Sequence, residues 1–311
     1  MKRKNRSGIG FGIVAGVAVL AVAGCCRAAD RPSVPTDGCL KVLMIGNSFS
    51  LSVTNQLPKV AAALGRDLDL ASLYISGCDL ETHARNVRKD GDESFRPYQY
   101  DRFVRGLQVV FRGRINVGAA LRAAAWDVVT LQQTSHLSWK PESYEPFLGE
   151  LVRTVRRLAP QAKLYIQETW SYTPWDGRLK EWGLDAAEMS DRIHATCASM
   201  ASKYGMGVIG MGPAVQAWRR QLPVRYAENS FGGDVVGGRF KKPQDCFVLK
   251  DGKWTVACDV FHLNERGKYL QALVWANCLL GADLHGLSYR PDCVTADEAR
   301  LMRTIAQSPV E

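Results

Sequence analysis

The stretch KVLMIGNSFS, residues 41–50, decides the fold class. Its first half is a nearly continuous apolar run, which is typical of a central parallel strand buried on both faces. Gly46 follows with the backbone freedom that a sharp turn needs, and residues 55–64 then read as a helix that stops at Gly65. The stretch therefore predicts a strand, a turn and a helix, which is the repeating unit of an α/β sheet.

Further apolar runs repeat this unit along the chain. We expect strands at residues 68–75, 126–131, 163–168 and 207–210, and helices at residues 141–158, 185–204 and 213–221. Strands that alternate with helices predict a parallel sheet with helices on both faces. The predicted fold class is α/β, a flavodoxin-like three-layer α/β/α sandwich with a central parallel sheet of about five strands.

The chain divides into a targeting segment, a tether and one domain. Its 311 residues are 46% hydrophobic, which suffices for one large α/β domain. We place this domain at residues 39–311, with insertions at about 79–125 and 222–258. Residues 1–24 read as a signal peptide with a basic start and an apolar segment at 9–23, and residues 25–38 read as a tether.

Three interpretations of the N-terminus stay open. Val22-Ala23-Gly24-Cys25 resembles a bacterial lipobox, which predicts cleavage before Cys25 and a lipid on its sulfur. This interpretation predicts a lipoprotein of the cell envelope, anchored to the membrane and facing the periplasm or the cell surface. Ordinary cleavage after Ala28 or Ala29 predicts a secreted protein, and an uncleaved anchor would have only about 15 apolar residues, which is short for a span.

Charge and the scarcity of histidine exclude some classes of function. Residues 1–24 carry four basic and no acidic side chains, so their removal lowers the formal charge from +9 to +5. The remaining Lys and Arg are scattered, which argues against nucleic-acid binding. Nine Cys suit an oxidising compartment, whereas five His and the lack of a C-x-x-C motif predict no metal site.

Residues 246–258 contain the turn signal Asp251-Gly252 between two short β-prone runs. A two-residue turn there pairs Lys250 with Lys253 and brings Cys246 near Cys258. The pattern predicts a hairpin, and it leaves open whether the two cysteines form a disulfide.

The stretch DVFHLNERGKYLQA, residues 259–272, carries the strongest chemical signal. Asp259 precedes His262 by three residues, and Asn264 is placed to cap a helix that is apolar almost all round through Leu280. A carboxylate that orients an imidazole predicts a general base, although a surface ion pair has the same spacing. A general base of this kind requires a nucleophile.

Ser48 is the candidate nucleophile, because it follows a strand at a turn that would present its hydroxyl and its N–H. Ligands of parallel sheets bind at the carboxyl ends of the strands. The loops at residues 46–50, 76–78 and 132–136 should therefore line one crevice with the Asp259 and His262 loop. Taken singly, Ser48 could be a helix cap, and Gly77 a turn glycine.

Taken together, these blocks resemble the SGNH hydrolases, also called GDSL esterases and lipases, over about residues 40–282. The first block of that family is G-D-S, and Gly46-Asn47-Ser48 matches it with Asn in place of Asp. Gly77 corresponds to the second block. The last block is the specific one, with matches at Asp259, His262, Asn264, Gly267 and Ala272.

The resemblance implies that Ser48 is the nucleophile, His262 the base and Asp259 the acid that orients it. It also implies an oxyanion hole formed by the N–H groups of Ser48 and Gly77 and by one side-chain amide. The third block departs from the family, since Leu131-Gln-Gln-Thr-Ser-His136 stands where the family has G-x-N-D. We prefer Gln133 as the amide donor, with Gln132 and His136 as alternatives.

The implied activity is a serine esterase that hydrolyses O-acyl esters, with acetyl esters of carbohydrates or cell-envelope glycans as the expected substrates. The alternatives are a glycan O-acyltransferase and an inactive binding lipoprotein. No metal or organic cofactor is required, and the expected partners are a small-molecule or glycan ester and, through the lipid, a membrane. His83, Trp139 and Trp170 are candidates for substrate binding, although packing of the loops would also explain them.

Overall fold

The computed structural model describes residues 31–33, 38–222, 233–238, 247–250, 253–256 and 259–307. Its centre is a seven-stranded sheet in the order β4-β3-β2-β1-β5-β6-β7. The strands are β1 (Cys39–Gly46), β2 (Asp67–Tyr74), β3 (Tyr98–Val104), β4 (Leu107–Ile115), β5 (Val128–Leu131), β6 (Lys163–Gln167) and β7 (Gly207–Ile209). The five strands expected from the sequence are β1, β2, β5, β6 and β7, and they pair in parallel.

The expected number of about five strands was wrong, because residues 79–125 supply two more. β3 and β4 pair antiparallel with each other and with β2, so they extend one edge of the sheet. The turn between them is Arg105-Gly106, and both residues have positive φ, at 49° and 80°. Turns of this kind match the twist of a hairpin, but they are usually announced by Asn-Gly or Asp-Gly.

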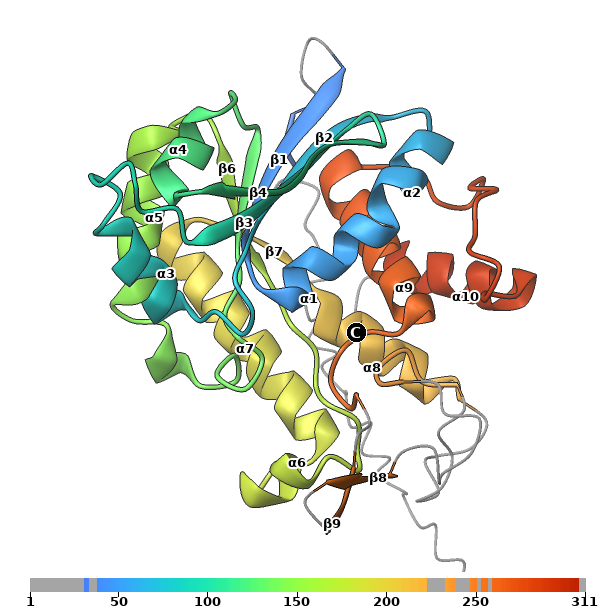
Figure 1. Cartoon of the computed structure of the whole chain (residues 1–311). Helices are drawn as coiled ribbons and strands as arrows, with labels where there is room; N and C mark the ends of the chain where they lie inside the picture. The colour runs from blue at the N-terminus through green and yellow to red at the C-terminus, as the bar shows by residue number, and fades with distance from the viewer. Residues whose placement is uncertain are drawn as a thin grey trace, which may run out of the picture.

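Helices cover both faces of the sheet and make the three layers that the sequence predicts (Figure 1). One face carries α3 (Leu80–Val87), α4 (Val117–Arg122), α5 (Phe147–Leu158) and α7 (Ala186–Tyr204). The other carries α1 (Ser48–Leu51), α2 (Leu57–Ala63), α8 (Met211–Arg220), α9 (Glu265–Trp275) and α10 (Ala296–Gln307). Shorter elements are α6 (Gly177–Glu181), the 3-10 turns Ser52–Asn55 and Pro141–Ser143, and the π-helical turn Ala276–Leu280 that follows α9.

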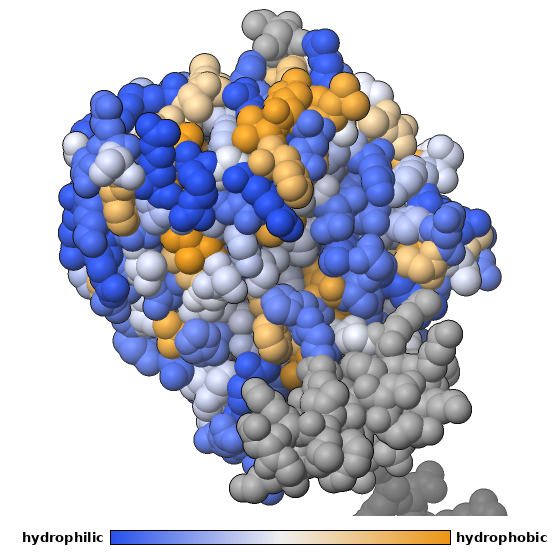
Figure 2. Space-filling view, in the orientation of Figure 1, coloured by the Kyte–Doolittle hydropathy of each residue, from blue (hydrophilic) through white to orange (hydrophobic). Residues whose placement is uncertain are grey.

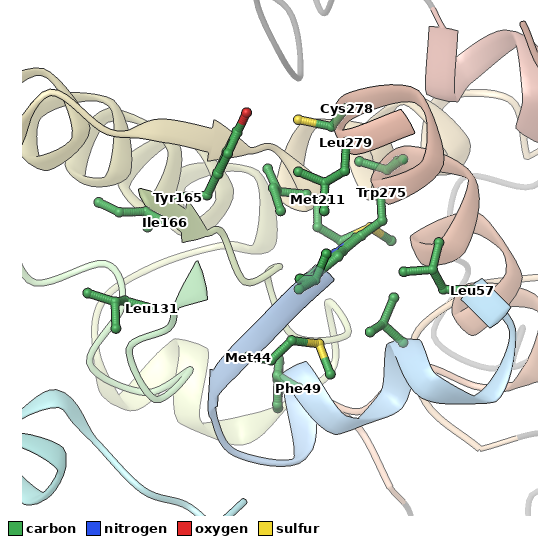
Figure 3. Packing of buried hydrophobic residues seen from close by; sticks show 14 of the residues in the cluster. Met44, Phe49, Leu57, Leu131, Tyr165, Ile166, Met211, Trp275, Cys278 and Leu279 are labelled. Atoms are coloured by element: carbon green, nitrogen blue, oxygen red, sulfur yellow. The ribbon is translucent and has the colours of Figure 1, made fainter. Parts of the chain in front are cut away.

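The core lies against β1, as its apolar run predicts. Val42 to Ile45 have no exposed surface, so the strand is buried on both faces. Figure 3 shows Met44 of β1, Phe49 of α1 and Leu57 of α2 with apolar side chains of the last helical region, including Trp275 of α9. Burial of a large apolar side chain stabilises a fold by roughly 1.5–3 kcal/mol, so this packing fixes the start of α1 against the sheet.

Several sequence predictions fall on residues outside the described ranges. These are the signal peptide at residues 1–24, most of the tether at 25–38 including Cys25, the Asp251-Gly252 turn and the Cys246–Cys258 pair. The hairpin itself is confirmed on the described residues, since β8 (Phe247–Lys250) and β9 (Lys253–Val256) pair antiparallel with Lys250 opposite Lys253. In the part of the chain that the structure describes, no helix is long and apolar enough to cross a membrane.

Candidate active site

The first half of the site is the turn between β1 and α1. Asn47 caps α1 by accepting a hydrogen bond from the N–H of Phe49 at 3.0 Å. A Cβ on Gly46 would collide with the Ser50 hydroxyl and come within 2.8 Å of Gln132 Oε1, so this glycine is required by close packing. Ser48 is therefore the first helical residue, where the N–H groups of a helix have no partner within it.

The second half is the loop before α9, and it meets the first. Ser48 Oγ lies 2.8 Å from His262 Nε2, although the two residues are 214 positions apart. His262 Nδ1 lies 2.8 Å from Asp259 Oδ2. The three side chains thus form a hydroxyl, imidazole and carboxylate chain in which both contacts have hydrogen-bond length.

Asp259 also shapes its own loop. Its second oxygen, Oδ1, accepts hydrogen bonds from the backbone N–H groups of His262 at 2.8 Å and Phe261 at 3.2 Å. Burial raises the pKa of the Asp259 carboxyl, but the hydrogen bonds from the His262 ring and backbone and from Phe261 outweigh it and leave the pKa below its usual range. The carboxylate is therefore ionised at neutral pH and suited to bind a ring N–H.

Backbone hydrogen bonds from two neighbouring segments hold this loop in place. The N–H of Gly237 donates to the His262 carbonyl at 2.7 Å, and that of Gly238 donates to the Asp259 carbonyl at 2.8 Å. From the other side, Thr173 N–H donates to the Val260 carbonyl at 3.0 Å. The loop therefore runs between two segments that each bind its backbone.

A buried ion pair fixes one of these segments. Asp234 and Arg219 of α8 are 3% and 5% exposed, and Arg219 Nη2 lies 3.1 Å from Asp234 Oδ2. Arg219 Nη1 also donates to Ser171 Oγ at 2.8 Å. Asn264, which caps α9, donates to the Asp234 carbonyl at 2.8 Å, so the pair is linked to the helix that follows His262.

Three buried glutamines from different elements hold the turn that carries Ser48. Gln167 of β6 and Gln271 of α9 each donate to the Phe49 carbonyl at 2.9 Å. Gln132, after β5, accepts from the N–H of Asn47 at 3.2 Å and from the Ser50 hydroxyl at 3.1 Å. These amides satisfy polar groups that would otherwise be buried without partners.

Asn47 connects the turn to the loop after β2. Its side-chain N–H donates to the Cys78 carbonyl at 2.9 Å, so the residue after Gly77 is bound directly beside Ser48. Gly77 has φ 61° and is exposed, and nothing lies within 4 Å of the position that a Cβ would take. The structure thus brings Gly77 to the edge of the site through the one residue that differs from the G-D-S pattern.

Comparison with known proteins places the chain in a family. A family model described as a domain of unknown function, DUF4886, matches residues 41–200, which is just over half of the chain. The chain belongs to the DUF4886 family. No curated protein matches the chain.

A solved structure of the same family is similar to this chain over most of its length. The crystal structure of a DUF4886 family protein from Bacteroides uniformis is 26% identical, covers 86% of this chain and 93% of that chain, and has a TM-score of 0.70. A candidate SGNH hydrolase from Slackia heliotrinireducens is 20% identical, covers 77% of this chain and 98% of that chain, and has a TM-score of 0.49. A candidate GDSL-like lipase from Parabacteroides merdae is 13% identical, covers 79% of this chain and 97% of that chain, and has a TM-score of 0.47. At these scores the last two structures say nothing about the chemistry of this DUF4886 protein.

The preferred amide donor of the oxyanion hole is occupied elsewhere. Gln133 donates both to the Ser143 carbonyl at 2.9 Å and to its hydroxyl at 3.1 Å, and it accepts from Leu80 and Thr134 N–H. The alternative Gln132 donates to the Gln133 carbonyl. Both amides therefore brace loops of the DUF4886 domain, and the expectation that Gln133 faces the oxyanion was wrong.

His136 is the remaining alternative. It is exposed, and among the described residues only its Nδ1 has a hydrogen-bond partner, Thr134 Oγ1 at 3.3 Å. Burial lowers the pKa of His136, and the cations Lys140 and Arg178 lower it further against the pull of Asp79. The ring is thus neutral at pH 7 and keeps one nitrogen available.

Two of the three predicted substrate-binding residues are inside the fold. His83 is fully buried, its Nδ1 lies 2.8 Å from the Tyr98 hydroxyl, and burial lowers its pKa to about 4. Trp170 is fully buried, stacks on Phe49 at 4.3 Å and donates to the Phe261 carbonyl at 2.7 Å. Neither side chain has exposed surface for a ligand, so the expectation that His83 and Trp170 bind the substrate was wrong.

Trp139 is the third predicted substrate-binding residue. It is partly buried, and its ring centroid lies 5.8 Å from that of Trp182. A role in binding stays a prediction for this residue.

We did not predict the bracing glutamines, the Arg219–Asp234 pair or the Asn47–Cys78 contact from the sequence. A signal for the glutamines exists, since Gln132 and Gln167 directly follow apolar runs and Gln271 interrupts one. A polar amide in such a run is either at an edge or hydrogen-bonded inside. The described residues contain no group of three or more His, Cys, Asp or Glu that could hold a metal ion.

Proposed function

We propose that the protein is a serine esterase that hydrolyses O-acyl esters, with Ser48 as nucleophile, His262 as base and Asp259 as the acid that orients it. The observation that supports this proposal is the chain of two 2.8 Å contacts, from Ser48 Oγ to His262 Nε2 and from His262 Nδ1 to Asp259 Oδ2. Activated hydroxyls in acyl transfer are recognised by this geometry and not by the order of residues in the chain.

The reaction proceeds in two steps. Ser48 Oγ forms a bond to the ester carbonyl carbon while His262 Nε2 takes its proton, and the alcohol then leaves with that proton. Water, deprotonated by the same nitrogen, then attacks the acyl group on Ser48. The bond from the acyl carbon to Ser48 Oγ breaks, Oγ takes the proton back from His262, and the carboxylic acid leaves. Asp259 keeps the proton of Nδ1 in place and stabilises the ring when it is positively charged.

The negative charge that develops on the carbonyl oxygen requires donors in the protein. We assign these to the N–H groups of Ser48 and Gly77, with His136 as the side-chain candidate because both glutamines are occupied. A donor of this kind is worth about 10²–10³ in rate. The bond from Asn47 to the Cys78 carbonyl supports this assignment, because it holds the residue after Gly77 beside the Ser48 turn.

An O-acyl carbohydrate, with acetyl as the acyl group, is the proposed substrate. Phe261 packs on the His262 ring at 4.3 Å, and Trp139 and Trp182 form a second aromatic pair, all of them partly exposed. Aromatic faces bind the apolar faces of sugar rings. The proposed location is the cell envelope, with residues 1–24 as a lipoprotein signal peptide and Cys25 as the lipidated residue that begins the tether.

The test compares hydrolysis of p-nitrophenyl acetate and an acetylated oligosaccharide by the wild type, Ser48→Ala and the control Ser202→Ala, an exposed serine of α7. We expect Ser48→Ala to lower kcat by about 10⁴–10⁶ and the control to match the wild type. A fluorophosphonate should label Ser48 alone. Equal rates for the wild type and Ser48→Ala would refute the proposed esterase activity. The lipid anchor is tested separately by Cys25→Ser, which should release the protein from membranes.

A further inference from the structure

β4 carries three exposed apolar side chains, which we call the stripe. Leu107, Val109 and Phe111 are 72%, 56% and 68% exposed, and they are the large exposed hydrophobic side chains of the described residues. They lie within five consecutive positions of β4, where bulges interrupt the pairing with β3, and Figure 2 shows an apolar area near the top of the molecule. Contiguous apolar surface of this kind marks an interaction site more often than scattered residues do.

The stripe is not needed for folding of the sheet. Val110 and Ile115 of β4 pack against the core, as does Phe103 of β3. β4 is the edge strand, so no further strand of the sheet pairs with its free edge. The exposed side chains thus serve something other than the packing of this domain.

Cations surround the stripe. Arg112 and Arg114 are exposed, and the Arg112 guanidinium lies 4.9 Å from the centre of the Phe111 ring. The hairpin at residues 98–115 contains four arginines and a single acidic residue, Asp101. Arg102 and Arg105 pair with Asp69 and Asp67 of β2, which leaves Arg112 and Arg114 as the cations beside the stripe. Asp101 is 4% exposed and accepts from the Arg112 N–H at 2.9 Å, so its charge is turned inward. The stripe therefore fits a partner with an apolar layer under negative charge.

The strand registers place the start of the stripe, Leu107, at the end of the sheet opposite to Ser48. Leu107 pairs with Val104, Val104 with Asp69 and Asp69 with Lys41 at the start of β1. Ser48 follows the other end of β1. Arg114, which pairs with Gln99, thus lies level with Gly46, whereas Leu107 lies level with the amino end of β1.

The chain enters the domain at that same end. Lys163, at the start of β6, donates to the Arg31 carbonyl at 2.7 Å, so Arg31 contacts the amino end of the sheet. In the sequence, the apolar segment at residues 9–23 precedes Arg31 by only seven residues, which reach at most about 25 Å. A membrane that holds this segment, or a lipid at Cys25, lies within that distance of the amino end.

We propose that the stripe of β4 and its flanking arginines dock on the surface of a bilayer that contains anionic lipids. Leu107, Val109 and Phe111 enter the boundary between headgroups and acyl chains, and Arg112 and Arg114 bind the phosphates.

A second copy of the chain fits the stripe less well. Pairing of two β4 edges about a two-fold axis would bring the exposed Arg112 and Arg114 of both copies together, and like charges across a strand pair are destabilising. A membrane of negative charge removes this conflict, and contact between copies becomes one outcome of the test.

The test uses the full chain in vesicles of phosphatidylcholine and phosphatidylglycerol, with photoreactive p-benzoylphenylalanine in place of Phe111. The control carries the same group in place of Lys180, an exposed residue of α6 that lies far from the amino end (Figure 1). We expect several-fold more lipid adduct at position 111 than at position 180. The excess should shrink when phosphatidylglycerol is omitted or salt is raised, since surface charges are screened.

Equal lipid adducts at the two positions would overturn the proposal, and so would an adduct from position 111 to a second protein chain. A variant with Arg112→Glu and Arg114→Glu, checked for an unchanged melting temperature, should lose most of the excess at position 111. An excess that persists in this variant would contradict the role of the arginines. None of these outcomes depends on esterase activity.

Discussion

Asn47→Asp is the substitution that tests the architecture of the site most directly, because it restores the G-D-S pattern of the family that the sequence resembles. In this protein, Asn47 is 2% exposed and uses both ends of its amide. Its oxygen caps Phe49 N–H at 3.0 Å, and its N–H donates to the Cys78 carbonyl at 2.9 Å. A carboxylate can replace the first contact but not the second.

The expected cost follows from the lost contact. The Cys78 carbonyl would face a carboxylate oxygen with no donor between them, and an unsatisfied buried acceptor costs about 1–3 kcal/mol. A loss of about 2 kcal/mol lowers the melting temperature of a domain of this size by about 4–8 °C. Since Gly77 precedes Cys78, we also expect kcat/KM for an ester substrate to fall by up to about 10²-fold.

The loss of stability in Asn47→Asp should depend on pH in a definite direction. The carbonyl and the burial raise the pKa of the new carboxyl in the folded state above its unfolded value of about 3.9. A protonated carboxyl can donate to Cys78, so the defect should be small at low pH and grow as the pH rises through the raised pKa.

The assay is urea unfolding at several pH values from about 4 to 8. The matched control is Asn55→Asp on the same segment, where the side chain is exposed. Stability at pH 8 equal to that of the wild type and of the control would refute the reasoning that Asn47 joins the two loops.

Two further predictions concern the loop before α9 and the buried ion pair that fixes a segment beside it. The pKa of Asp259 is lowered in the fold, so its stabilisation is present above the unfolded value of about 3.9 and lost as the pH falls through the lowered value. The difference in melting temperature between the wild type and Asp259→Asn should therefore close in acid, and a gap that stays constant down to about pH 2 would contradict this. Arg219→Met should cost about 3–5 kcal/mol in urea unfolding, because it leaves Asp234 charged and buried. Adding Asp234→Asn should recover much of that stability, and a double variant no more stable than the single one would show that the charge is not the cause.

The parallel core of the fold was predictable because each of its strands is a buried apolar run. β1, β2, β5, β6 and β7 follow the expected ranges to within a few residues. β3 and β4 were missed because an edge hairpin mixes exposed and buried residues, and because its turn is Arg105-Gly106 in place of a common turn pair. The helix expected at residues 141–158 begins as a separate 3-10 turn, which is a matter of local geometry that periodicity does not resolve.

By itself, the sequence determined the candidate chemistry of this protein. A serine after a strand and an Asp-x-x-His block before a capped helix are local patterns, and they named Ser48, Asp259 and His262 as the candidate residues. Only the tertiary structure decided which amides are free. Gln132 and Gln133 are adjacent and chemically alike, and a third glutamine, Gln271, comes from α9. Each of them binds a partner that distant segments bring to it, at Asn47, Leu80 and Phe49. The direction of a buried side chain depends on such partners, and no local pattern in the sequence contains them.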